Sequence, residues 1–301
     1  MKTPEQFTFL PTIKQFIDWN KKIGYGDNWI LGDKENLLAK NLTALSQGES
    51  VDFLIWNCIG FDWLPNQNGK YPPCRLNDNL EAAITLYYQQ KLLELTGFLS
   101  KIGSPNLFVL VPSNEALYEE MWTYTQSLDE RQALLNRTVT GLNQALLNIP
   151  WPNNTYIESL RWDEYLKQKG ILTDPKQYSF AGRNKIIASP DFSQIEQNAI
   201  SAGQSYFQQY GLYVKKDILA DKRIQYEGMY TGEGIALKEV MNQGKKIIII
   251  NLEEFRVAKR TFFGADETLP IITPIKRKEM EAYYQWENQV QLTRLKQYAK
   301  N

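Results

Sequence analysis

A chain of 301 residues, 43% hydrophobic and 23% charged, has an ordinary globular composition and is long enough for one large domain or two small ones. Its 34 basic residues equal its 34 acidic residues, so no net charge attracts the chain to nucleic acid or to an anionic membrane. The absence of histidine excludes Ser-His-Asp and Cys-His catalysis, HExxH zinc sites and the two-histidine iron triad within the chain, which leaves proton transfer to Asp, Glu, Lys, Tyr or Cys.

Cysteine usage and hydropathy favour a cytoplasmic protein. Two cysteines, Cys58 and Cys74, suit a reducing compartment better than a disulfide framework. The N-terminus has no uninterrupted apolar stretch of the signal-peptide kind, and no segment approaches the roughly 18 apolar residues of a membrane span. No carboxylate cluster has metal-ligand spacing and no motif indicates a cofactor. We therefore predict no metal, no cofactor and no membrane partner.

The first half of the chain alternates helical and strand patterns. Helical spacing of apolar residues predicts helices over 4–20, over 34–47, from Asp78 to Gly103, from Ser113, and over roughly 127–147. Apolar runs predict three strands, SVDFLIW at 50–56, NLFVLVP at 106–112 and TYIES at 155–159. This order is typical of an α/β fold with a Rossmann-like, doubly wound, mostly parallel sheet flanked by helices.

The second half is less regular. Pro190 opens a helical pattern that runs to Tyr210, and Thr231 is placed to cap a helix that ends at Gly244. The run KKIIIINL at 245–252 is the strongest strand pattern in the chain. An exposed loop over 259–275 and a closing helix over 276–299 complete the prediction. Because the late strand rejoins the sheet, we predict a single domain over 1–301.

Ligands of an open parallel sheet bind beyond the carboxyl ends of its strands, at the point where the strand order reverses. This rule selects the loops at 57–77, 112–115, 158–163 and 251–256. The first of these loops is the richest in chemistry. It combines Asn57, Cys58, Asp62, Trp63 and Asn66. A thiol in such a place is either a nucleophile or a small buried hydrophobe, and the sequence leaves both interpretations open.

Two further segments carry candidate residues. A strand is followed by a helix start at Ser113, Asn114 and Glu115. Ser113 there either binds an anion at the helix N-terminus or simply caps the helix. YEGMYTGEGIALKEV at 226–240 contains GxxxGxG without the Lys-Ser/Thr of a P-loop, so it does not indicate nucleotide binding. Its Glu227, Tyr230 and Glu233 cluster before the predicted helix, either as coupled proton carriers or as solvated turn residues.

Residues 42–165 resemble the isonitrile (isocyanide) synthases, whose G-x-P-I-x-F-x-L-P strand leads into F-P-x-K-S-x-N, a P-D-x-x-E helix and a strand ending in S-D-G. The chain reads GESVDFLIWNCIGFDWLPN, LNDNLEAA and LFVLVPSNE in the same order. The matching positions are Phe61, Asn66, Asp78, Glu81 and Ser113, while Leu64 and Asn114 replace the lysine and the S-D-G acid, and the R-x-S-x-H-P motif has no counterpart. The resemblance implies conversion of an aromatic amino acid's amino group to an isonitrile, with carbon from ribulose 5-phosphate.

The chain is also similar to the tRNA-dependent cyclodipeptide synthases, which have a Rossmann-like sheet and a G-x-S nucleophile that ends the first strand. Cys58 stands at the place of that serine and Tyr206 at the place of a late tyrosine, but Gln209 and Tyr210 stand where the family has glutamate. The basic helices that grip tRNA have only Arg131 and Arg137 as counterparts in the helix over 127–147. The neutral charge therefore argues against tRNA as a partner.

These patterns predict a biosynthetic enzyme of the transferase or lyase class that modifies an amino acid or a related small amine in secondary metabolism. The alternatives are a cyclodipeptide synthase and a non-catalytic binding protein on the same scaffold. The predicted catalytic residues are Cys58, Asp62, Tyr230 and Glu233. The predicted substrate-binding residues are Asn57, Trp63, Asn66, Ser113, Asn114, Glu115, Tyr206 and Glu227.

Overall fold

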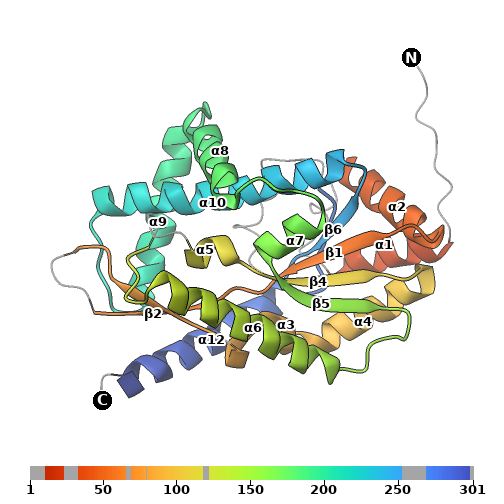
Figure 1. The fold of residues 1–301 in the computed structure, drawn as a ribbon, viewed down its shortest axis with the longest axis horizontal. Helices are drawn as coiled ribbons and strands as arrows, with labels where there is room; N and C mark the ends of the chain where they lie inside the picture. The colour runs from red at the N-terminus through yellow and green to blue at the C-terminus, as the bar shows by residue number, and fades with distance from the viewer. Residues whose placement is uncertain are drawn as a thin grey trace.

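The computed structural model describes residues 11–23, 33–65, 69–78, 80–117, 122–252 and 269–298 (Figure 1). Its centre is a five-stranded sheet in the order β5-β4-β1-β6-β7, and every neighbouring pair is parallel. The strands are β1 (Val51–Trp56), β4 (Asn106–Val111), β5 (Tyr156–Arg161), β6 (Lys246–Ile250) and β7 (Ile271–Ile272). The predicted Rossmann-like α/β fold is therefore confirmed.

The sequence of β1 and β6 explains their central place. All six residues of β1 are buried, and β6 contributes four consecutive buried isoleucines. Strands that are covered on both faces need apolar side chains on both sides, so these segments do not alternate between apolar and polar residues, and the one acid of β1, Asp52, is paired with Tyr165 and Lys169. The chain runs from β1 outward to β4 and β5, then returns to place β6 on the other side of β1. The strand order thus reverses between β1 and β6.

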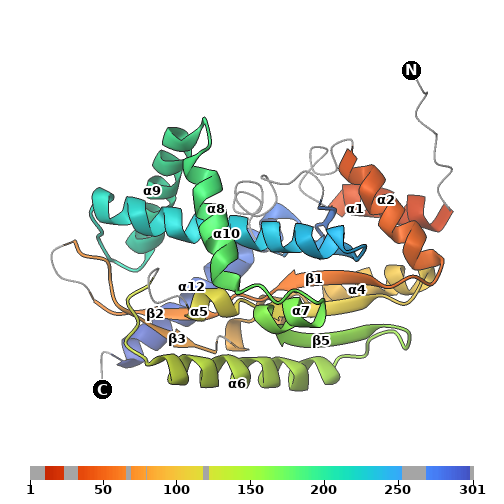
Figure 2. The same cartoon turned by 45° about the horizontal axis from the view of Figure 1, so that its top comes forward.

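Helices cover both sides of this sheet. The helices before β6 are α1 (Pro11–Ile23), α2 (Asp33–Ser46), α3 (Ile84–Tyr87), α4 (Gln89–Ile102), α5 (Ser113–Leu117), α6 (Leu128–Leu147), α7 (Trp162–Gln168), α8 (Pro175–Ile187), α9 (Phe192–Gln209) and α10 (Lys216–Asn242). A last helix, α12 (Arg277–Tyr298), ends the described chain. Helices α6 and α10 lie on opposite sides of the sheet, and α8 stands away from it on α10 (Figure 2).

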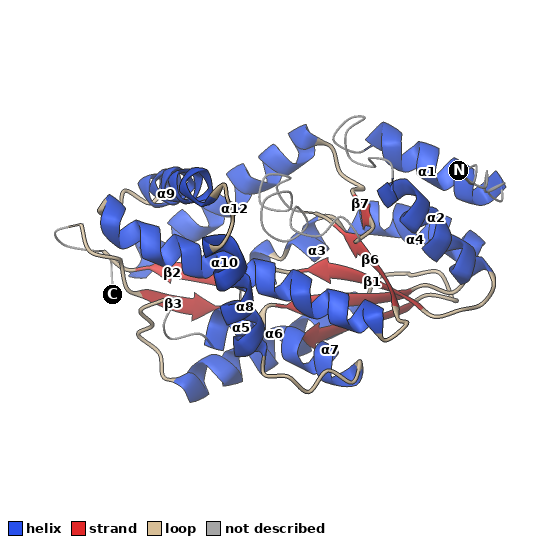
Figure 3. Cartoon of the chain, turned by 90° about the horizontal axis from the view of Figure 1, so that it is seen from above, coloured by secondary structure: helices blue, strands red, loops and turns tan. Residues whose placement is uncertain are grey.

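A short antiparallel hairpin, β2 (Gly60–Trp63) with β3 (Cys74–Asn77), occupies part of the loop predicted over 57–77. Seen from above, this hairpin and α9 lie beyond the carboxyl ends of the strands (Figure 3). At the start of the hairpin the Asn77 side chain packs against Gly60, where a Cβ would lie only 2.0 Å from Asn77 Oδ1 and would displace this side chain. The hairpin therefore belongs to the edge of the sheet where this fold class binds its ligands.

The single helix predicted from Asp78 to Gly103 is wrong, because the segment is broken into a 3-10 turn η1 (Leu80–Ala82), α3 and α4. Ala83 adopts an extended conformation, with φ −62° and ψ 116°. The backbone N–H and the hydroxyl of Thr85 point to Asn57 Oδ1, at 3.4 and 3.1 Å. A long-range contact with the loop after β1 thus replaces the local helical hydrogen bond.

Two predictions for the second half are also wrong. Thr231 does not cap a helix, because α10 extends over 27 residues from Lys216 and places Thr231 in its interior. The exposed loop over 259–275 is contradicted in its last part, since residues 269–275 are buried and contain β7 beside β6. Residues 253–268 lie outside the described chain. The closing helix predicted over 276–299 is confirmed as α12.

The glycines of the motif at 226–240 form a contact between helices. A Cβ on Gly232 would lie 2.3 Å from the carbonyl oxygen of Tyr178, and a Cβ on Gly182 would lie 2.1 Å from that of Gly228. Both contacts involve backbone atoms, so α8 and α10 approach each other as closely as two helices without side chains allow. This backbone contact is the structural reason for glycines that otherwise weaken a helix.

Candidate functional site

Buried polar residues follow the strands at the carboxyl edge of the sheet. Asn57 comes directly after β1, Ser113 soon after β4 and Asn251 directly after β6, and their exposed fractions are 0, 0 and 6%. Burial of a polar side chain is unfavourable unless it forms hydrogen bonds or serves a ligand. These positions surround the point where the strand order reverses, as the sequence predicts.

In the loop after β1, Asn57 has a structural contact and Cys58 is partly exposed. Asn57 Oδ1 accepts hydrogen bonds from Thr85, which ties β1 to α3. Cys58 is partly exposed, whereas Cys74 is fully buried, and burial raises the pKa of the Cys74 thiol. Cys58 lies near enough to Tyr226 that its charge contributes to raising the pKa of that tyrosine, after burial as the main cause. Cys58 is therefore accessible and next to the site.

The hairpin contributes Asp62 and Trp63, which are both 2% exposed. Asp62 Oδ1 accepts a hydrogen bond of 2.8 Å from Asn77 Nδ2 on the facing strand. Asn66, predicted to contact the substrate, lies outside the described residues. The structure thus places Asp62 in the hairpin, with its orientation fixed by the neighbouring strand.

Trp63 lies within a group of rings. Five ring centroids lie 4.9 to 6.1 Å from that of Trp63, and Trp122 in turn contacts the ring of Tyr226 at 5.6 Å. We call this group the aromatic cluster: Phe61, Trp63, Tyr71, Trp122, Tyr206, Phe207 and Tyr226. Trp63 Nε1 donates a hydrogen bond of 3.0 Å to the Tyr206 hydroxyl. Two residues predicted from distant segments, Trp63 and Tyr206, are therefore in direct contact.

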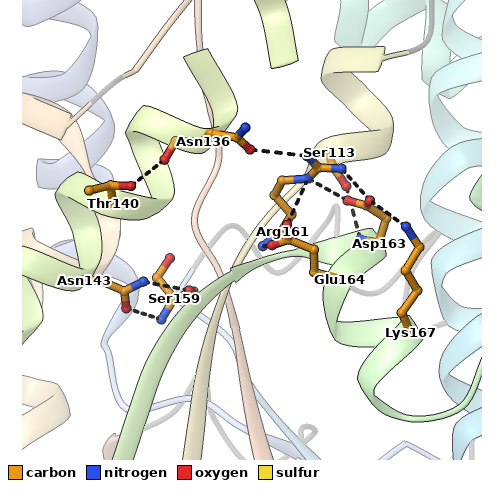
Figure 4. Close-up of polar contacts among 9 residues, drawn as sticks. All are labelled: Ser113, Asn136, Thr140, Asn143, Ser159, Arg161, Asp163, Glu164 and Lys167. Carbon is orange, nitrogen blue, oxygen red and sulfur yellow. Dashed lines mark hydrogen bonds and ion pairs between the residues drawn. The ribbon is translucent and has the colours of Figure 1, made fainter. Parts of the chain in front are cut away.

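Ser113 has a structural partner. Its hydroxyl oxygen accepts a hydrogen bond of 3.2 Å from the backbone N–H of Asp163, at the start of α7 (Figure 4). Of the two predicted roles this contact corresponds to the cap, although the helix it caps is α7 and not α5. With only five residues, α5 is also too short to act as a strong helix dipole.

The Asp163 carboxylate completes this network. Arg161 Nε and Nη2 donate to its two oxygens at 3.0 and 2.5 Å, and Arg161 Nη1 donates to Asn136 Oδ1 on α6 (Figure 4). Burial alone would raise the pKa of Asp163, but hydrogen bonds from Arg161 and Ser113 and the charges of Arg161 and Lys167 outweigh it and lower the pKa. The network fixes α5 relative to α6 and α7, and α5 carries the next two site residues.

Asn114 joins α5 to α10. Its Nδ2 donates a hydrogen bond of 2.8 Å to Glu233 Oε1, and the two residues are 4 and 1% exposed. Two helical turns before Glu233, the hydroxyl of Tyr226 lies 3.0 Å from that of Tyr230. Asn114, Tyr230 and Glu233 are thus brought together with Tyr226, which the sequence reasoning missed.

Glu115 lies among the tyrosines, although it is only 3% exposed. Burial raises the pKa of Tyr206 to about 12, and the negative charge of Glu115 contributes to this rise. The same carboxylate contributes to raising the pKa of Tyr71 and Tyr226, where burial is again the main cause. The negative charge of Glu115 therefore acts on three tyrosines of the aromatic cluster.

Glu227 is paired with a cation. Its Oε1 lies 3.4 Å from Arg223 Nη2, and the two side chains are 11 and 13% exposed. The guanidinium carbon of Arg223 lies 4.6 Å from the ring centroid of Tyr226, within the range of a cation–π contact. Arg223 thus adds a positive charge to the aromatic cluster.

Glu227, Tyr230 and Glu233 do not precede a helix, as predicted, but lie inside α10. At about 100° per residue their spacing places them on one face, together with Arg223 and Tyr226. The glycines that contact α8 fall on the opposite face. A helix predicted to begin at Lys216 would have placed Arg223 and Tyr226 on the same helix face as Glu227, Tyr230 and Glu233. Tyr71 and Trp122 carry no such signal, because loops bring them in.

Two negative findings concern the described residues. Among them no group of histidine, cysteine, aspartate or glutamate side chains has the arrangement of a metal site. No helix in the described segments combines the length and the apolar character that crossing a membrane requires.

Comparison with known proteins finds remote likeness among solved structures. No family model matches the chain, and no curated protein matches it. Among solved structures it is similar to the crystal structure of the PvcA protein from Pseudomonas aeruginosa, at 10% sequence identity and a TM-score of 0.46, over 82% of this chain and 80% of that chain. A likeness at this level is too remote to carry an argument about what the chain binds or does.

Proposed function

We propose that this chain is an enzyme that modifies an amino acid or a related small amine, with chemistry of the isonitrile-synthase kind. The observation that carries the proposal is the burial of two carboxylates at the carboxyl edge of the sheet. Glu233 lies on the face of α10 that carries Tyr226 and Tyr230, whose hydroxyls are 3.0 Å apart, and the charge of Glu115 acts on Tyr226. Buried acids of this kind are unfavourable for stability and are concentrated at functional sites. The resemblance of residues 42–165 to the isonitrile synthases indicates the class of substrate.

In this proposal Glu233 and Tyr230 transfer protons to and from the substrate. A chain without histidine needs carboxylates or phenols for this step. A carboxylate removed from water is a stronger base than one in solution, since burial penalises its charged form. Asn114 orients Glu233 through the hydrogen bond of 2.8 Å, and Asp62 on the hairpin contacts the substrate head group.

A second candidate is cyclodipeptide synthesis from aminoacyl-tRNA through Cys58. The observation that favours it is the partial exposure of Cys58 at the end of β1, close to Tyr226. A thiolate in this place could accept an aminoacyl group as a thioester. The equal numbers of basic and acidic residues argue against a tRNA partner, so this candidate ranks second.

The test is an activity assay on the purified full-length chain. Each of the twenty amino acids is incubated with ribulose 5-phosphate, and products are identified by mass spectrometry. We expect an isonitrile from at least one amino acid. Glu233→Gln keeps the shape and the contact with Asn114 but removes the base, so it should lower kcat by roughly 100-fold or more.

The matched control is Asp221→Asn, because Asp221 is an exposed acid on the same helix, paired with Arg183. Its activity should equal that of the wild type. An unchanged rate in Glu233→Gln would show that this carboxylate does not transfer the proton. Diketopiperazines from charged tRNA, lost in Cys58→Ala, would support the second candidate. No product and no rise in melting temperature with any amino acid would indicate the non-catalytic binding protein.

A further inference from the structure

Three buried polar groups of one region find no hydrogen-bond partner among the residues that the structure describes. They are Arg223 Nε, the Tyr71 hydroxyl and Trp122 Nε1, and each can donate a hydrogen bond. Buried polar groups in proteins are nearly always paired, and a buried donor without an acceptor loses its hydration without compensation. Three such donors in one region offer hydrogen bonds to a ligand that carries acceptor oxygens.

The three side chains that carry these donors lie close together. The ring centroids of Tyr71 and Trp122 are 5.7 Å apart, those of Trp122 and Tyr226 are 5.6 Å apart, and the Arg223 guanidinium lies over Tyr226. Burial raises the pKa of Tyr71 and of Tyr226, and the charge of Arg223 partly offsets this rise at both. Arg223 therefore lies close to both phenols, on the side of α10 that carries the proposed site.

The packing of Arg223 holds it in this place. Its stem crosses α9 at Gly203, where an added Cβ would lie 3.0 Å from Arg223 Cδ. Its contact with Glu227 uses a single nitrogen at 3.4 Å, which is long for a charged hydrogen bond. A guanidinium binds a carboxylate best through two parallel hydrogen bonds. Arg223 therefore has donors left to bind the carboxylate of a ligand.

The charges around Arg223 restrict the kind of anion. Glu227 lies beside Arg223, and the Glu115 carboxylate acts on Tyr71 and Tyr226, so a simple anion would meet two negative groups. A zwitterion avoids this repulsion, because its ammonium group offsets the two carboxylates. An α-amino acid carries both charges on one carbon atom.

We propose that Arg223, Tyr71 and Trp122 form the subsite for the carboxylate of an α-amino acid, whose ammonium group faces Glu115 and Glu227. The inference rests on the proposed function for the amino group of the substrate. It extends that function by requiring a free carboxylate, which excludes simple amines as substrates.

The experiment is isothermal titration calorimetry of the full-length chain. The twenty amino acids are titrated first, and each that binds is compared with its methyl ester and with its decarboxylated amine, for example L-phenylalanine with its methyl ester and phenethylamine. We expect the ester and the amine to bind roughly 10- to 100-fold more weakly, as for the loss of a charged hydrogen-bonded pair. This ligand series needs no variant and so does not depend on variant folding.

Variants then assign the effect to residues. Arg223→Gln should weaken the binding of the amino acid by a similar factor and remove the difference between acid and ester. Arg223→Lys keeps the positive charge but loses the paired guanidinium donors, so its affinity for the amino acid should lie between those of the wild type and Arg223→Gln. Arg183→Gln is the matched control, because Arg183 lies on α8 against the same helix, in a partly exposed pair with Asp221. It should bind like the wild type.

Tyr71→Phe separates a binding role from a structural one. If the hydroxyl serves only the ligand, its removal should leave the melting temperature of the free protein unchanged or raised, while binding weakens. A hydroxyl with a structural partner would instead lower the melting temperature when removed.

Each possible result of these experiments supports or contradicts a named part of the proposal. Equal binding of acid, ester and amine would overturn the carboxylate subsite and leave the proposed function standing. If acetate bound as tightly as the amino acid, the subsite would be a simple anion site, and the proposed preference for a zwitterion would be wrong. Wild-type binding in Arg223→Gln would remove Arg223 from the subsite. No binding by any amino acid would overturn both the inference and the amino-acid substrate of the proposed function.

Discussion

At the scale of single residues, the site depends on side chains that support others. Ser113 and Arg161 both bind Asp163, and this network fixes the short helix that carries Asn114 and Glu115 (Figure 4). The sequence singles out Ser113 because it follows a strand, and the structure shows that its hydroxyl caps the next helix in space. A serine directly after a strand therefore indicates that the residue lies at the carboxyl edge of the sheet. Whether it binds a ligand or caps a helix depends on which group it contacts.

The first prediction concerns Asp163→Asn. The carboxylate accepts charged hydrogen bonds from Arg161, and its side chain is 12% exposed, so the substitution should lower the free energy of unfolding by about 2 kcal/mol at neutral pH. The folded-state pKa lies below the ordinary 3.8, so the unfolded chain binds a proton first as the pH falls. The stabilisation is complete above about pH 5 and is lost as the pH falls through the lowered pKa.

Urea unfolding of wild type and variant between pH 7 and pH 3 checks this prediction. The gap between the two curves should be constant at neutral pH and should narrow below about pH 4, because asparagine does not ionise. Asp129→Asn, at an exposed position on α6, is the control and should show a small effect. A gap that widens toward acid pH would contradict the lowered pKa.

At the scale of elements, α10 has two faces with different tasks. Gly228 and Gly232 contact α8 through the backbone, while Arg223, Tyr226 and Glu233 lie on the other side with the site. Glycines permit close backbone approach both to a ligand and to a second helix, so glycines alone do not distinguish the two uses in a sequence. Here a second helix occupies the space that a ligand would take.

The second prediction is that Gly232→Ala destabilises the protein. The new Cβ would meet the carbonyl oxygen of Tyr178 at 2.3 Å and the nitrogen of Ser179 at 2.7 Å, and these backbone atoms move only if α8 moves. The loss should be about 1 to 3 kcal/mol in urea unfolding. Gly97→Ala on α4 is the matched control, since its Cβ would meet nothing within 4 Å.

Alanine at position 97 should leave stability unchanged or raise it by about 0.5 to 1 kcal/mol, because it reduces the entropy of the unfolded chain. Equal effects of the two substitutions would show that the contact between α8 and α10 is not as close as the structure has it.

At the scale of the whole molecule, the last helix joins the two halves of the chain. The Tyr283 hydroxyl on α12 donates a hydrogen bond of 2.7 Å to the carbonyl of Ala82, and the Tyr88 hydroxyl donates to the carbonyl of Glu279 at 2.8 Å. Both contacts bridge about two thirds of the sequence. They link α12 to the segment where the predicted long helix is broken. The single domain over 1–301 stays a prediction that these contacts favour.

The third prediction tests this link. Tyr283→Phe leaves the buried Ala82 carbonyl without its donor and should lower the free energy of unfolding by about 1 to 2 kcal/mol. Tyr87→Phe, at a neighbouring tyrosine that is 41% exposed, should have no measurable effect. Unfolding followed by fluorescence and by circular dichroism should coincide if the chain unfolds as one unit, and separate transitions would contradict the single domain.

The sequence by itself determined the parallel sheet and predicted the edge at which the candidate site lies. Apolar runs such as VDFLIW and KIIII predict strands covered on both faces, and their order along the chain predicts a parallel sheet. The absence of histidine restricts proton transfer to acids, lysines, tyrosines and thiols. These properties are local or compositional, which is why they can be read from one chain.

Only the tertiary structure decided which side chains meet. Asn57 breaks a predicted helix by bonding Thr85, glycines at 228 and 232 contact α8, and Tyr71 and Trp122 join Arg223 from separate segments. None of these contacts has a local signal, since each joins residues that are distant in the chain. Their free energy belongs to packing and to buried hydrogen bonds, and both exist only once the sheet has brought the segments together.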